Sequence, residues 1–136
     1  MIVRDPARAS FEALVRQLSL TELDANFGMH WAVYAMKYLD EWESHYTCTL
    51  AKMKGKAYCV IESENALETL KHCLSTHFQM SLSEETSKCI HEFSFKNRMT
   101  DLYKDAFNKY YNKSLPQEQK DKMKAVFVST LGKLKS

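Results

Sequence analysis

Residues 29–53 read MHWAVYAMKYLDEWESHYTCTLAKM, the longest stretch of the chain in which hydrophobic residues recur regularly. The recurring residues, three or four positions apart, are Trp31, Ala35, Tyr38, Leu39, Trp42, Tyr46, Leu50 and Met53. The charged residues that fall largely between them are Lys37, Asp40, Glu41 and Glu43. This spacing places the hydrophobic side chains on one face of an α-helix. We therefore predict a central helix that ends near Gly55.

The sequence before this stretch contains two helix-start signals. Asp5 followed by Pro6 is typical of an N-cap and a first helical residue. Helical spacing then continues in Phe11, Leu14, Val15 and Leu18. Ser19 and Glu22 have the spacing of a capping box, and Gly28 is the residue type that often ends a helix in a left-handed conformation. We predict a first helix from Pro6 and a short second helix or turn that stops at Gly28.

The sequence after Gly55 predicts four further helices. Their caps are expected at Ser63 or Asn65, at Ser83 and at Ser114. Their buried faces are expected to contain Leu67, Leu70, Leu74 and Phe78; Ile90 and Phe93; Phe95, Met99, Leu102, Tyr103, Ala106, Phe107, Tyr110 and Tyr111; and Met123, Val126, Phe127, Thr130, Leu131 and Leu134. Residues 57–61, AYCVI, have strand-forming side chains, but a lone strand would lack a partner. We predict a helical turn or the start of the next helix there.

Glycine and proline are scarce, with three Gly and two Pro in 136 residues. An all-β domain of this length would need many more turns, which these residues usually mark. The length suits one domain, and the composition is that of an ordinary globular protein. We predict an all-α fold: a compact bundle of six or seven amphipathic helices in a single domain over residues 1–136.

The N-terminal residues and the cysteines bear on the compartment. Residues 1–6 lack the apolar core of a secretory signal, and no apolar run is long enough to cross a bilayer. The four cysteines are irregularly spaced, which favours free and largely buried thiols. We predict a cytoplasmic or nuclear protein that does not bind membranes. A mature secreted helical protein would look similar, with Asn112 as a glycosylation acceptor.

Two pairs of potential metal ligands have helical spacing. His45 and Cys48 lie three positions apart, and Cys73 and His77 lie four apart. Together they would supply the four ligands of a zinc site if two helices brought them together. Coincidental pairs are expected among five His and four Cys. We therefore predict no metal ion and keep these four residues only as a candidate set.

The chain lacks the sequence motifs of common enzymes. It contains no Gly-x-Ser-x-Gly nucleophile motif and no glycine-rich loop of the kind that holds phosphate. We predict no catalytic residues, no enzyme activity and no cofactor.

The charge is divided unevenly along the sequence. Residues 1–95 contain 9 Lys and Arg against 13 Asp and Glu, whereas residues 96–136 contain 10 against 4. A basic surface in this last third would suit nucleic acid or an acidic partner, with Arg98, Lys120 and Lys124 as first candidates. Lysines on the polar side of amphipathic helices are more often only a solvated face, and nine of these ten residues are Lys.

Aromatic residues of the central helix have two interpretations. Trp31, Tyr38, Trp42 and Tyr46 fit a core seam, because large aromatic side chains dominate helix packing. They also fit a groove for a partner, because Trp and Tyr are enriched at binding hot spots. Tyr110 and Tyr111 are about 100° apart on one helix, so one of them is expected to be exposed.

The function expected from the sequence is therefore an interaction module. We predict a non-catalytic adaptor or regulatory domain that takes a helix or short peptide of another protein into a groove between its own helices. The partner-binding candidates are Trp31, Tyr38, Trp42, Tyr46, Tyr110 and Tyr111. The alternative is a nucleic-acid-binding module that uses residues 96–136.

Overall fold

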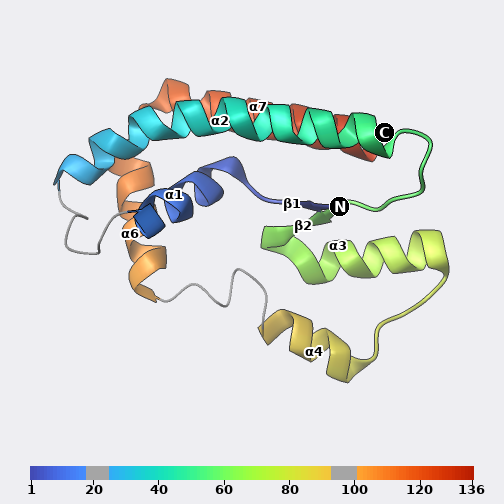
Figure 1. Cartoon of the computed structure of the whole chain (residues 1–136). Helices are drawn as coiled ribbons and strands as arrows, with labels where there is room; N and C mark the ends of the chain where they lie inside the picture. The colour runs from blue at the N-terminus through green and yellow to red at the C-terminus, as the bar shows by residue number, and fades with distance from the viewer. Residues whose placement is uncertain (18–24, 93–100) are drawn as a thin grey trace.

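The computed structural model describes residues 1–17, 25–92 and 101–136, and it confirms the all-α class (Figure 1). Its helices are α1 (Pro6–Gln17), α2 (Ala25–Met53), α3 (Ala66–Cys73), α4 (Glu84–Glu92), α6 (Asp101–Lys113) and α7 (Gln117–Lys135). The short elements are the strands β1 (Ile2–Val3) and β2 (Ile61–Glu62), the 3-10 turn η2 (Ser63–Asn65) and the π-turn η3 (Leu74–Phe78).

Helix α1 starts where its sequence predicts. The backbone N–H of Ala7 donates to Oδ1 of Asp5 over 2.8 Å, so Asp5 caps the helix and Pro6 is its first residue. Phe11, Leu14 and Val15 are buried on one face, as predicted. The remaining predicted position of that face, Leu18, lies outside the described residues.

Helix α2 begins earlier than predicted, because Gly28 lies inside it. The prediction that Gly28 ends a helix is wrong, and packing explains the glycine instead. A Cβ atom at this position would lie 2.1 Å from Oγ and 2.6 Å from Cβ of Ser114. The glycine therefore lets α2 approach the turn before α7 closely. The predicted end of the helix is confirmed at Met53, and Gly55 follows with φ of 81°.

The two short strands are a correction to the sequence analysis. β1 and β2 pair in parallel, with Ile2 opposite Ile61 and Val3 opposite Glu62. The N–H of Ile61 also donates to the carbonyl oxygen of Met1 over 2.8 Å. Residues 57–61 were expected to form a helical turn because no strand partner is near in the sequence. The strand partner is the N-terminal segment. Because that segment is far away in the sequence, the hydropathy pattern around residues 57–61 cannot reveal it.

The predicted caps of the later helices are partly confirmed. Ser83 caps α4, because its Oγ accepts the N–H of Thr86 over 3.2 Å. Asn65 precedes α3 but makes no side-chain cap bond. Ser114 is not a cap, because its N–H donates to the carbonyl of Tyr110 and α7 starts only after Pro116. The predictions for Ser19, Glu22, Phe93, Phe95 and Met99, and those for the side chains of Leu102 and Tyr103, lie outside what the structure describes.

The helices form two regions that differ in packing. We call α1, α2, α6 and α7 the body. In it, α1 runs antiparallel to α2, α7 lies along α2, and α6 crosses near one end (Figure 1). We call residues 66–92, with α3, η3 and α4, the hairpin. The hairpin lies on the far side of the strands from α2 and α7 (Figure 1).

The body is built around aromatic rings. The ring of Phe11 meets those of Phe27, Trp31 and Phe107 edge-on, with centroids 5.5, 5.1 and 5.4 Å apart. This is the favourable geometry for aromatic pairs. A second buried cluster joins the N-terminal strand to α2 and α7 through Val3, Trp42, Tyr46 and Leu134. The body core is thus supplied by helices that are far apart in the sequence.

Candidate interaction site

The aromatic residues predicted to bind a partner are mostly part of the core. Trp31 is 0%, Trp42 5%, Tyr46 8% and Tyr110 7% exposed. The indole N–H of Trp31 donates to Oγ of Ser10 over 3.1 Å, and that of Trp42 donates to the carbonyl oxygen of Arg4 over 2.9 Å. The expectation that these four residues line an open groove is therefore wrong. The helical spacing of these four residues therefore reflects packing in the core.

Tyr38 and Tyr111 are half-buried. The Tyr38 ring lies against Tyr34, with centroids 5.9 Å apart, and Tyr111 stacks on Phe107 at 5.4 Å. Desolvation by burial raises the pKa of both the Tyr38 and the Tyr111 hydroxyl. Tyr110 is buried and Tyr111 is half-buried, so neither tyrosine of the 110–111 pair is exposed as expected.

The candidate metal ligands are not brought together as a site. His45 and Cys48 are exposed on α2, and His77 is exposed in η3. Cys73 forms a disulfide with Cys59, with Cα atoms 5.9 Å apart, so its sulfur is not free to bind a metal ion. Across residues 1–17, 25–92 and 101–136 no group of three or more His, Cys, Asp and Glu has an arrangement that could hold one.

The disulfide also corrects the prediction about thiols. Cys59 and Cys73 are bonded, and the two free cysteines, Cys48 and Cys89, are exposed rather than buried. Disulfides persist mainly in oxidising compartments. The cytoplasmic or nuclear location was predicted from the N-terminal residues and the apolar runs of the sequence, and it stays a prediction.

The basic candidates are divided among different surroundings. Arg98 lies outside the described residues. The ammonium of Lys120 lies 5.2 Å over the ring of Tyr111, whereas Lys124 is exposed. Nζ of Lys135 pairs with Oε2 of Glu62 at 3.0 Å. The ammonium of Lys109 lies 5.6 Å over the ring of Tyr110, so at least three lysines of the basic third are engaged with the chain itself, whereas the candidate Lys124 is exposed.

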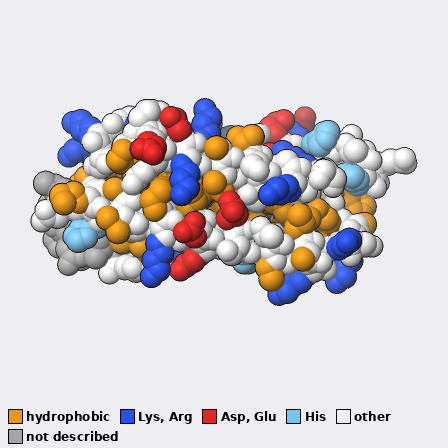
Figure 2. Space-filling view, turned by 90° about the horizontal axis from the view of Figure 1, so that it is seen from above, with side chains coloured by type: hydrophobic (Ala, Val, Ile, Leu, Met, Phe, Trp, Pro, Cys, Tyr) orange, Lys and Arg blue, Asp and Glu red, His pale blue; other side chains and the backbone are white. Residues whose placement is uncertain are grey.

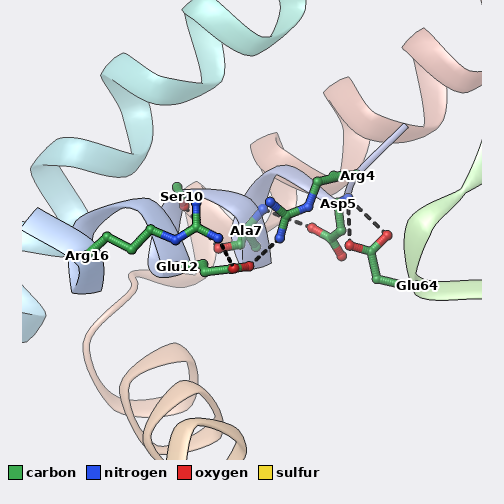
Figure 3. Close-up of polar contacts among 7 residues, drawn as sticks. All are labelled: Arg4, Asp5, Ala7, Ser10, Glu12, Arg16 and Glu64. Atoms are coloured by element: carbon green, nitrogen blue, oxygen red, sulfur yellow. Dashed lines mark hydrogen bonds and ion pairs between the residues drawn. The ribbon is translucent and has the colours of Figure 1, made fainter. Parts of the chain in front are cut away.

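A set of polar contacts joins η2, which leads into the hairpin, to the start of α1 (Figure 3). The N–H of Asp5 is shared by the two carboxylate oxygens of Glu64, each at 3.1 Å. Next to it, the guanidinium groups of Arg4 and Arg16 both pair with the carboxylate of Glu12. Burial raises the pKa of Glu64, because desolvation outweighs the hydrogen bond from Asp5.

This junction is a structural anchor. It fixes η2, which leads into α3, beside β1 and α1. The Cys59–Cys73 disulfide fixes the other end of α3 to the segment before β2. Together these links hold a pair of helices whose described residues are part of neither hydrophobic core cluster of the body.

The hairpin leaves most of its apolar side chains partly open. Among its described helical residues only Cys73 is buried. The half-buried apolar side chains of the hairpin include Leu67, Leu70, Leu74, Leu82 and Ile90. Phe78 and Met80, in the connection between the helices, are each 59% exposed. We call these seven residues the hairpin face.

The chemistry of the hairpin face suits the binding of a helix. Two helices side by side form a hydrophobic groove that a third amphipathic helix can fill. The sequence pattern had assigned Leu67, Leu70, Leu74 and Phe78 to a buried helix face. The length of the helices distinguishes these residues from those of the body. Helices α3 and α4 have only 8 and 9 residues, so the two helices together cannot bury a wide hydrophobic face.

Known proteins add no further information about this site. No family model, no curated protein and no solved structure matches the chain. In the described part of the chain, none of the helices combines the length and apolar character needed to cross a membrane.

Proposed function

We propose that the chain is a non-catalytic interaction module that binds an amphipathic helix of a partner protein on the hairpin face. The observation that supports this proposal is the contrast between the buried aromatic core of the body and the open apolar side chains of the hairpin. The mode of binding is the one expected from the sequence, a helix held between helices. The proposed binding site is the hairpin face, in place of the aromatic residues that the sequence analysis predicted.

Burial of the hairpin face supplies the binding energy. Burying the part of a leucine or phenylalanine side chain that is still exposed stabilises a complex by about 1 kcal/mol or more. Phe78 and Met80 are the most exposed large apolar residues of the hairpin, so they contribute the largest change in area. Exposed apolar groups that cluster in this way are typical of binding surfaces.

Charge specifies the kind of partner helix. Between residues 66 and 92 four glutamates, at positions 68, 84, 85 and 92, outnumber two lysines, at 71 and 88. A partner helix with Lys or Arg beside its apolar stripe complements this surface. Such charge complementarity raises the association rate and the selectivity more than the affinity.

The test is a titration followed by amide NMR, with a synthetic amphipathic Leu/Lys helix as probe and a Leu/Glu helix as its matched control. We expect saturable shifts confined to residues 66–92 and tighter binding of the Leu/Lys probe. Phe78→Asp should weaken binding at least tenfold. Val128→Asp, at an exposed apolar residue of α7, should leave it unchanged. Shifts spread over the whole chain, or equal weakening by both substitutions, would contradict the proposal.

The alternative function, nucleic-acid binding, gives a different result with a different probe. An oligonucleotide that binds through the C-terminal lysines would shift amides of α7 and lose affinity steeply with salt. Lys124→Glu would weaken that binding and leave the Leu/Lys helix unaffected. Helix binding to an apolar face should survive moderate salt. The oligonucleotide result would replace the present proposal if it alone were found.

A further inference from the structure

The outward face of α2 repeats with a period that suits helix pairing. One row of exposed positions on α2, spaced three and four residues apart, contains His30, Val33, Lys37, Asp40, Ser44, Thr47 and Ala51. This is the spacing of the contact seam of a coiled coil. Val33 is 77% exposed, the highest value among the exposed large hydrophobic residues of the described chain. The seam is separate from the core face of α2, which contains Trp31 and Trp42.

The order of residues along this seam is self-complementary. If a second α2 is laid antiparallel, with its centre between Lys37 and Asp40, each Lys37 meets Asp40 of the other copy. In the same register Val33 meets Ser44, and His30 meets Thr47. Large side chains of one half thus oppose small side chains of the other half, and opposite charges meet at the centre. A twofold interface requires this kind of self-matching pattern.

The two charged residues have no ion-pair partner in the described parts of the chain. The ion pairs found there join Arg4 and Arg16 to Glu12, and Lys135 to Glu62. Lys37 and Asp40 are both exposed. Figure 2, which looks down on α2 and α7, shows hydrophobic side chains on this side of the molecule among Lys, Arg, Asp and Glu.

We propose that the seam is a homodimer interface, in which α2 pairs antiparallel with α2 of a second copy through reciprocal Lys37–Asp40 contacts. A hollow of about 390 Å³, lined by Leu14, His30, Val33, Tyr34 and Lys37, lies along one edge of the seam. It leaves room for side chains of the second copy. One helix pair makes an interface at the small end of the usual range, so the dimer forms reversibly with concentration.

This inference is independent of the function proposed for the hairpin. The hairpin lies beyond the strands, on the opposite side of α1 from α2 and α7 (Figure 1). Pairing through the outward seam of α2 therefore leaves both hairpins open, and failure of either proposal leaves the other standing.

The charge pattern gives a swap experiment. Sedimentation equilibrium should show a monomer–dimer equilibrium for the natural chain. Lys37→Glu or Asp40→Lys alone places like charges together and should weaken the dimer on the order of tenfold. The double variant restores opposite charges and should recover the dimer. Lys52→Glu, exposed on α2 outside the seam, is the matched control. A chain that stays monomeric at millimolar concentration, or a double variant no better than the single ones, would overturn the proposal.

Spin labels measure the register directly. With Cys89→Ser, a label on the exposed native Cys48 should give an inter-copy distance of about 30 Å, because an α-helix rises 1.5 Å per residue and Cys48 lies far from the twofold centre. A label on Glu41→Cys, exposed beside the seam and close to its centre, in a Cys48→Ser, Cys89→Ser chain, should give a much shorter distance of roughly 15 Å. Equal short distances at both positions would indicate parallel pairing and contradict the proposed interface.

Discussion

The body and the hairpin are both helical, but they are stabilised in different ways. In the body, Phe11, Phe27, Trp31 and Phe107 form a buried aromatic cluster in which each ring contacts others from a different helix. In the hairpin, only Cys73 among the described helical residues is buried, and its sulfur is bonded to Cys59. The body therefore depends on hydrophobic burial, whereas the hairpin depends on links to the strands and to α1.

This difference indicates where a partner can act. A complete core gains nothing from another helix, because its apolar side chains are already removed from water. A helix pair with an open apolar face gains additional burial when a third helix joins it. The links at Glu64 and at the disulfide keep such a face in place without burying it.

The largest expected effect comes from the centre of the body. Phe11→Ala should lower the free energy of unfolding by about 3–5 kcal/mol, since it leaves a cavity among three aromatic neighbours. The matched substitution in the hairpin, Phe78→Ala, should cost less than about 0.5 kcal/mol, because that ring is largely exposed. Denaturant unfolding monitored by circular dichroism measures both. Similar losses for the two variants would remove the distinction between the regions.

The second effect concerns the disulfide. The Cys59→Ala/Cys73→Ala chain lacks a crosslink between residues separated by 14 positions, and a loop of that size contributes about 3 kcal/mol. We expect faster amide exchange in residues 66–92, on the order of 100-fold, with α2 unchanged. Exchange measured by mass spectrometry tests this expectation. Cys48→Ala/Cys89→Ala, which changes only exposed free thiols, is the control.

The third effect tests the close approach in the body. Gly28→Ala puts a Cβ atom 2.6 Å from Cβ of Ser114, and the resulting overlap should cost about 1–3 kcal/mol despite the better helix propensity of alanine. Adding Ser114→Gly removes the obstructing side chain and should recover most of the loss. Thermal unfolding of the two variants and the double variant gives the coupling. Full independence of the two substitutions would mean that α2 is not held against this turn.

The smallest effect is a pH dependence at the junction. Burial raises the pKa of Glu64 above its usual value of 4.5. At a pH between the unfolded and the folded pKa, the carboxyl of Glu64 therefore keeps its proton in the folded chain and has lost it in the unfolded chain. The stability from this group is full at pH below the unfolded pKa and is lost as the pH rises through the folded pKa. Glu64→Gln should remove that decline. Unfolding free energies of both chains across this range of pH measure the difference, and parallel curves would show that Glu64 does not contribute.

Much of the fold follows from local sequence patterns. Asp5 and Pro6 start α1, Ser83 caps α4, and the hydrophobic period of residues 29–53 matches the greater part of α2. These signals act over a few residues, so they can be recognised without knowledge of the rest of the chain. The same reasoning failed at Gly28, because the close contact that requires glycine comes from Ser114, far along the sequence.

The candidate site was harder to predict for the same reason. Aromatic residues at helical spacing have the same pattern whether they face the core or a partner, so Trp31 and Trp42 could not be assigned before the helices were placed. The irregular spacing of the cysteines gave no indication that Cys59 bonds to Cys73. The pairing of β1 with β2 likewise joins segments that are distant in the sequence.

Native-state hydrogen exchange tests the division between body and hairpin most directly. We predict that the amides of α2 exchange only through global unfolding, whereas those of α3 and α4 exchange through a separate opening of lower free energy. A bound Leu/Lys helix should slow the hairpin amides and leave those of α2 unchanged. A single opening free energy shared by all the described helices would contradict the account.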